Sequence, residues 1–150
     1  LSQKVQKVAE DTGKEVMSRD IWKVFEENYI SISGRLKLLN YALSSTEDSS
    51  GYTSDQVEIS LEDKNKKVNL TAIGGGPIEA FISSINKYFS TSISVSDYHQ
   101  QSVTSGADAK AAAFIELTMD GKNEWGAGID GNTTKASFQA IISGLNKLIT

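Results

Sequence analysis

The spacing of apolar residues changes near Arg35, from a period near 3.6 to a period of 2. In residues 1–30, Val5, Val8 and Ala9 fall on one side of a helix among Lys, Gln and Glu residues. A second amphipathic helix is predicted to run to about Tyr29. Two such short helices bury too little apolar surface to fold alone, so we expect them to pack against another part of the protein.

From Arg35 the alternation becomes that of strands, and three strands are followed by a helix. The clearest strand is Val57, Ile59 and Leu61, with polar residues between them. A hairpin turn is predicted at 63–66, and a third strand ends in a glycine run. Pro77 then suits the first turn of a helix, because its missing N–H is no loss there.

The same order of elements recurs in the second half of the chain. Strands are predicted around 93–103, 111–119 and 125–129, with a helix ending near Leu148. Residues 79–89 and 139–149 share letters at five of eleven positions. We therefore predict an α+β fold of two strand–strand–strand–helix units (βββα), an internal duplication, against the alternative of chance likeness between amphipathic helices. The predicted boundaries are a helical linker at 1–34 and an α+β domain at 35–150, with repeats at about 35–90 and 91–150.

Composition excludes several kinds of chemistry. The chain has no cysteine and one histidine, which removes disulfides, thiol catalysis and metal sites built on Cys or on paired His. Its 15 Lys+Arg against 19 Asp+Glu give a net charge of −4, so no nucleic-acid partner is expected. The longest apolar run, at 111–115, is far too short to span a bilayer, and no membrane partner is expected.

Catalysis is poorly supported by the residues present. Asp97 and His99 fall on one face of a predicted strand and are expected to touch, but no serine lies in a strained nucleophile turn. The sequence therefore predicts neither catalytic residues nor metal ligands for this chain.

The glycine run at 74–76 is the best candidate for binding. Where a strand ends and a helix begins, glycines expose backbone N–H groups at the positive end of the helix dipole, which suits a carboxylate. The alternative is a tight strand-to-helix turn without a ligand. Alanines at 109, 111, 112 and 113 leave room above the sheet, either for a second subunit or for a small apolar ligand.

Four motifs, in this order and spacing, resemble the C-terminal regulatory domain of 2-isopropylmalate synthase, of the actinobacterial and fungal type. They are Ile-Gly-Gly-Gly-Pro-Ile-Glu-Ala at 73–80, Asp-Tyr at 97–98, Thr-Ser-Gly-Ala-Asp-Ala-Lys-Ala at 104–111 and Trp-Gly-Ala-Gly-Ile-Asp at 125–130. Residues 5–29 are similar to the end of the linker that precedes that domain.

The resemblance implies a dimeric sensor that binds leucine and inhibits a distant active site. The parent enzyme would join acetyl-CoA to 2-oxoisovalerate on a TIM barrel with a divalent metal, and that barrel is not in this sequence. Carried over by motif, the leucine-binding residues are Gly74, Gly76, Ile78, Glu79, Val95, Tyr98, Ser102, Ala109, Ala111 and Ile129. Glu79 and Ser102 stand where relatives can carry smaller apolar residues, and the loop is Gly-Gly-Gly rather than the commoner Gly-Asn-Gly.

We therefore predict a feedback sensor for leucine, with leucine at or near a homodimer interface and the catalytic domain of the same chain as its partner. The ammonium acceptor would be Asp97, Asp130 or a main-chain carbonyl. Two alternatives stay open: an isoleucine sensor of a citramalate synthase, and a purely structural dimerisation module. The chain opens on Leu1 rather than Met, so we expect it to be part of a longer protein, cytoplasmic or, for a fungal parent, mitochondrial.

Overall fold

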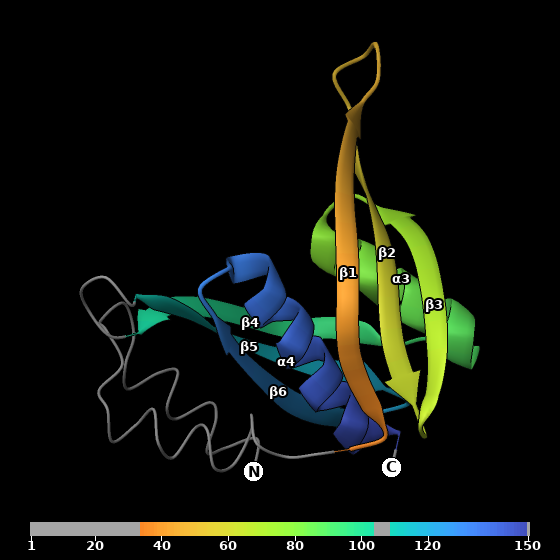
Figure 1. Cartoon of the computed structure of the whole chain (residues 1–150), viewed down its shortest axis with the longest axis vertical. Helices are drawn as coiled ribbons and strands as arrows, with labels where there is room; N and C mark the ends of the chain where they lie inside the picture. Colours follow the sequence, from red (N-terminus) through yellow and green to blue (C-terminus); the bar gives the residue numbers. More distant parts are fainter. Residues whose placement is uncertain (1–33, 104–108, 150) are drawn as a thin grey trace. The chain divides into compact units, whose positions relative to one another are not determined.

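The computed structural model describes residues 34–103 and 109–149, and these form two compact units. The first unit is 35–94; the second is 95–149 together with Gly34. The elements, in chain order, are β1 (Leu36–Glu47), β2 (Thr53–Asp63), β3 (Lys66–Gly74), α3 (Pro77–Phe89), β4 (Ser94–Val103), β5 (Lys110–Met119), β6 (Lys122–Asp130) and α4 (Thr133–Leu148) (Figure 1). The predicted duplicated βββα fold is thus confirmed, whereas the linker predicted at 1–34 lies outside the described residues except for Gly34.

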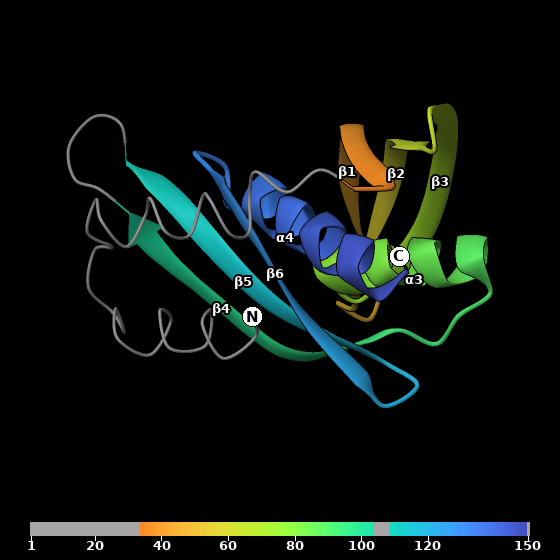
Figure 2. The same ribbon diagram turned by 90° about the horizontal axis from the view of Figure 1, so that it is seen from below.

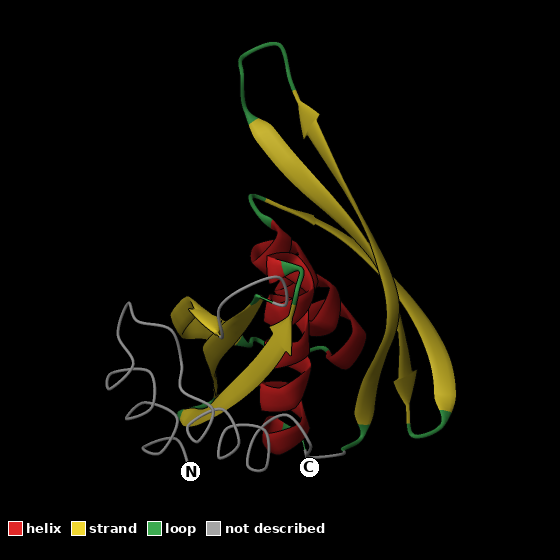
Figure 3. Ribbon diagram, turned by 60° about the vertical axis from the view of Figure 1, so that its left-hand side comes forward, coloured by secondary structure: helices red, strands yellow, loops and turns green. Residues whose placement is uncertain are grey.

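In the first unit, three antiparallel strands in the order β1-β2-β3 carry α3 on one face. Val57, Ile59 and Leu61 of β2 are at most 1% exposed and pack on this face, as their alternation predicted. The β2–β3 turn places Lys64 and Asn65 at φ 51° and 68°, the left-handed pair that matches the twist of a two-residue hairpin. β1 and β2 continue past the end of β3, so their hairpin projects beyond the sheet (Figure 3).

Both units carry the same short hydrogen bond, from a tyrosine N–H to the side chain of the residue before it, in their first strand. In β1 the register with β2 shifts between Leu38 and Asn40, and the Asn40 side chain accepts a hydrogen bond from the Tyr41 N–H at 2.8 Å. In β4 the Asp97 carboxylate accepts one from the Tyr98 N–H, also at 2.8 Å. This pair of short polar residue and tyrosine is a second mark of the duplication, beyond the letters that the two helices share.

In the second unit, α4 packs against β5 and β6 of the antiparallel sheet β4-β5-β6 (Figure 2). A Cβ on Gly126 would lie 2.0 Å from the Ala140 carbonyl oxygen, and one on Gly128 2.2 Å from that of Ala136. The helix backbone therefore lies directly on β6, which only glycine allows. Ala113 pairs with Gly128 and shares its face, so its small side chain is explained by the chain's own helix rather than by a ligand.

An ionic cluster around the buried Asp63 side chain stabilises the start of the first unit. The Asp63 side chain, 6% exposed, accepts hydrogen bonds from Arg35 Nε at 2.5 Å and Nη2 at 3.2 Å and from the Tyr88 hydroxyl at 2.7 Å. The Arg35 guanidinium also lies over the Phe89 ring, 5.1 Å from its centroid. The hydrogen bond from Arg35, more than any other contact, lowers the pKa of Asp63 below its usual range, and Tyr88 lowers it further.

The part of the chain that the structure describes contains no helix long and apolar enough to cross a membrane.

Candidate ligand-binding site

The start of α3 presents backbone donors that no side chain of the described residues occupies. Its N-cap is Gly76, with extended backbone (φ −159°), and within 34–103 and 109–149 no side chain caps the helix. Pro77 follows, and the first helical hydrogen bond runs from the Ala80 N–H to the Gly76 carbonyl at 3.0 Å. The N–H groups of Ile78 and Glu79 therefore point out of the first turn at the positive end of the helix dipole.

The three glycines before α3 serve different purposes. A Cβ on Gly74 would lie 2.6 Å from the Ala80 nitrogen, so this residue must be glycine for β3 to turn directly into the helix. A Cβ on Gly76 would meet no atom within 4 Å, so the space over the helix start is open. A Cβ on Gly75 would lie 3.0 Å from Glu79 Oε2 and 4.0 Å from the Tyr52 hydroxyl oxygen.

The start of α4 is closed by its own side chains. Its N-cap Asn132 accepts a hydrogen bond from the Lys135 N–H at 3.0 Å. Asp130 Oδ2 accepts from the Asn132 N–H at 2.8 Å, and Lys135 Nζ lies 3.8 Å from Asp130 Oδ1. The two units thus share a topology, but within the described residues the start of α4 has a side-chain cap and the start of α3 has none.

The ten predicted site residues divide between the units. Four belong to the first: Gly74, Gly76, Ile78 and Glu79 lie together in the β3–α3 loop and the first turn of α3. Ile78 is half-buried and Glu79 is exposed. These four residues lie close together because they fall within six consecutive positions, 74–79, and their role in binding stays a prediction.

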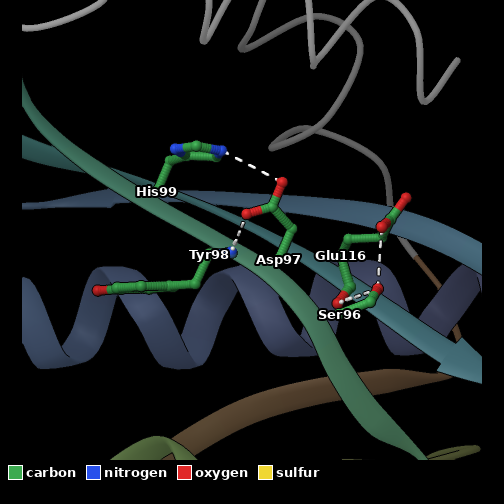
Figure 4. Close-up of polar contacts among 5 residues, drawn as sticks. All are labelled: Ser96, Asp97, Tyr98, His99 and Glu116. Atoms are coloured by element: carbon green, nitrogen blue, oxygen red, sulfur yellow. Dashed lines mark hydrogen bonds and ion pairs between the residues drawn. The ribbon is translucent and has the colours of Figure 1, made fainter.

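Six of the predicted site residues belong to the second unit. One of them, Tyr98, has its hydroxyl held by hydrogen bonds. Its side chain extends from β4 toward α4, with its hydroxyl 3.0 Å from Ser137 Oγ and 2.7 Å from Gln100 Oε1 (Figure 4). Val95, on the same strand, is 37% exposed. Ser102 and Ala109 are exposed at the two ends of the segment 104–108, and this segment, part of the third motif, lies outside the described residues.

Ala111 and Ile129 of the second unit do not share a face. Ile129 pairs with Ala112, while Ala111 pairs with Asp130, so the side chains of Ala111 and Ile129 project to opposite sides of the sheet. Ala111 is 9% exposed and lies on the face of β5 that α4 covers, whereas Ile129 is half-buried and its N–H donates to Gln139 Oε1 at 3.2 Å.

Asp97 and His99 do touch, as their spacing predicted. His99 Nε2 lies 3.3 Å from Asp97 Oδ2 (Figure 4), and both side chains are about half exposed. The His99 ring also stacks on Trp125, with 6.2 Å between centroids. Nearby, the Ser96 hydroxyl donates to the Glu116 carboxylate at 2.9 Å. No group of three or more His, Cys, Asp or Glu residues that could hold a metal occurs among the described residues.

Tyr52 is a residue near the glycine run that the sequence motifs do not indicate. The hairpin tip that carries it is fixed by Asp48, which accepts hydrogen bonds from the Ser50 N–H at 2.9 Å, the Ser50 hydroxyl at 2.6 Å and the Tyr52 N–H at 3.0 Å. These bonds lower the pKa of Asp48 below its usual value, and the bond from the Ser50 hydroxyl has the largest effect. Tyr52 is 62% exposed. The one feature of the sequence that could have indicated Tyr52 is its place as a large aromatic residue in a loop of Ser, Asp and Gly residues.

Two βββα units with one open helix start define a duplicated α+β domain. The chain belongs to the LeuA allosteric (dimerisation) domain family, which it matches over residues 15–149. It is similar to proteins named 2-isopropylmalate synthase: 37% identical over 149 residues to that of Parvibaculum lavamentivorans, 33% over 147 to that of Cupriavidus taiwanensis and 30% over 146 to that of Mycobacterium leprae. In each case the match covers 97% of this chain but only 24–25% of the relative, so the chain spans about a quarter of their length.

Proposed function

We propose that this domain binds L-leucine and thereby mediates feedback inhibition of a 2-isopropylmalate synthase, as a homodimer. The family is described as an allosteric and dimerisation domain, and the three bacterial relatives carry that enzyme name. The catalytic part, with its acetyl-CoA and divalent metal, would lie in the three quarters of the relatives' length that this chain does not span. Because these relatives are bacterial, we propose the cytoplasm as its compartment rather than a mitochondrion.

The observation that carries the proposal is the open start of α3. An amino acid needs donors for its carboxylate, and the uncapped first turn after Gly76 offers backbone N–H groups in a positive field. The open space over Gly76 gives a small ligand access to them. The capped start of α4 has no such vacancy, which makes the first unit the carboxylate-binding half.

The apolar part of leucine would be met in the first unit by Ile78, which is half-buried in the first turn of α3. The role of the six predicted residues of the second unit stays a prediction. Leucine and valine differ by one methylene, which is worth only about 1–3 kcal/mol in an apolar pocket. The domain is therefore expected to prefer leucine by a moderate factor rather than to reject valine outright.

Inhibition further requires that leucine bind one state of the enzyme more tightly than the other. A ligand with equal affinity for the active and the inhibited state would change nothing, however tightly it bound. Leucine affinity should accordingly fall when substrates of the catalytic part are present.

Calorimetric titration of this chain with leucine, isoleucine and valine tests the proposal. We expect saturable heat with leucine at lower concentrations than with the other two. Tightest binding of isoleucine would favour the sensor of a citramalate synthase instead. Folded, dimeric protein that gives no heat with any of the three at millimolar concentration would leave the structural dimerisation module.

A further inference from the structure

The two acidic residues considered for the ligand ammonium already have partners. Asp97 accepts a hydrogen bond from the Tyr98 N–H and contacts His99, and Asp130 accepts from the Asn132 N–H. Near the glycine run, Asp55 pairs with Gly74 across the sheet, and its carboxylate accepts a hydrogen bond from the Ser45 hydroxyl. An acceptor beside the open helix start, if it is not a main-chain carbonyl, must therefore be another carboxylate.

Glu79 meets that need. It is exposed in the first turn of α3, and its carboxylate folds back over the loop, where Oε2 comes within 3.0 Å of the Cβ position of Gly75. Within the described part of the chain, no side chain forms a hydrogen bond or ion pair with it. A carboxylate placed here repels a second anion but attracts a cation a few ångströms away.

The Tyr52 hydroxyl approaches the same point from a distant part of the sequence. It lies 4.0 Å from that Cβ position, and the Asp48 hydrogen bonds fix the backbone from which it projects. A phenolic hydroxyl both donates and accepts, so it can accept a hydrogen bond from an ammonium or donate one to a carboxylate. Any side chain on Gly75 would fill the space between the two groups.

Resting on the proposed function, we propose that Glu79, assisted by Tyr52, binds the ammonium group of the ligand and selects amino acids over the corresponding acids. The zwitterion would place its carboxylate on the N–H groups of α3 and its ammonium on Glu79. An acid without the amino group, or a 2-oxo acid, meets the same donors but is repelled by Glu79. The sensor would then ignore the 2-oxo acids that the proposed enzyme uses.

The test compares leucine with 4-methylpentanoate, which is leucine without its amino group, by calorimetry on this chain and its Glu79→Gln variant. We expect the variant to bind leucine at least tenfold more weakly and 4-methylpentanoate equally or more tightly. Tyr52→Phe should weaken leucine binding several-fold without strengthening the binding of the acid. Glu58→Gln, an exposed glutamate of the same unit on β2, is the matched control and should change neither affinity.

Leucine binding by Glu79→Gln at the wild-type affinity would overturn this inference while leaving the proposed function in place. An equal loss for leucine and for 4-methylpentanoate would overturn it as well, because a merely structural effect does not distinguish the two ligands. If the wild-type chain binds no leucine, the proposed function fails, and this assignment fails with it.

Discussion

The two βββα units have one topology and two ways of holding their helix. In the second unit, α4 lies directly on β6 through Gly126 and Gly128, and Asn132 caps its start. In the first unit only Gly74 is forced to be glycine by its helix, and the start of α3 has no cap. Uncapped donors reduce helix stability. The comparison supports the proposal that the first unit, rather than the second, binds the ligand.

The largest expected effect comes from Gly126→Ala. The added Cβ meets the Ala140 carbonyl at 2.0 Å, and backbone on both sides prevents an easy adjustment. We expect a loss of about 3 kcal/mol of unfolding free energy, at the upper end for overpacked cores. Urea denaturation measures it, with Gly131→Ala as the control, because a Cβ there has no neighbour within 4 Å. Equal stability of the two variants would contradict the close packing of α4.

The first unit is stabilised instead by its ionic cluster around Asp63. Asp63→Asn should lower the free energy of unfolding by about 2 kcal/mol, which is typical of hydrogen bonds to a charged group. The folded-state pKa of Asp63 is lowered. Its contribution is therefore complete above the unfolded pKa of about 3.9 and is lost as the pH falls through the folded pKa. Thermal unfolding between pH 7 and pH 2 should show a weaker loss of stability in acid for the variant than for the wild type. The same acid profile in both proteins would exclude Asp63 as its source.

The sequence predicted much of the fold because the alternation is strong where strands are buried on one face, as at Val57, Ile59 and Leu61. It could not predict the reason for the glycines of β6, because Gly126 matters only through a helix that follows later in the chain. The helix starts lie 56 residues apart, at Gly76 and Asn132, although the shared letters lie 60 apart, because those letters begin at the third residue of α3 and at the seventh residue of α4.

The candidate site was only partly predictable for similar reasons. The cluster around Gly74 and Gly76 is local in sequence and follows from a motif. Tyr52 reaches it from the hairpin between β1 and β2, and nothing local indicates that contact. The opposite orientations of Ala111 and Ile129 depend on the strand register, which alternation alone does not fix to one residue.

Closing the open helix start should remove the functional difference between the units. In Gly76→Asn, the side chain can accept a hydrogen bond from the first turn of α3, as Asn132 does in α4. We expect a stability gain of a few tenths of a kcal/mol, because glycine is already a tolerable cap. Leucine affinity should fall about tenfold, near 1.4 kcal/mol, because the donors are then occupied. Gly131→Asn in the second unit is the control and should leave leucine binding unchanged; unchanged binding in Gly76→Asn itself would contradict the account.

The smallest effect is expected from removing the side-chain cap at the start of α4. Asn132→Ala removes the cap of α4 and should cost about 1 kcal/mol of stability without reducing leucine affinity. Paired thermal melts and leucine titrations of this variant check both expectations. A loss of leucine binding in a folded Asn132→Ala protein would place the ligand at the second unit and contradict the account.

Amide chemical shifts during a leucine titration test the central claim most directly. In 15N-labelled protein, the N–H signals of Ile78 and Glu79 should move in a saturable way as leucine occupies the start of α3, while that of Lys135, already bonded to Asn132, should stay in place. Saturation with leucine that leaves Ile78 and Glu79 unmoved, or that moves Lys135 instead, would contradict the account.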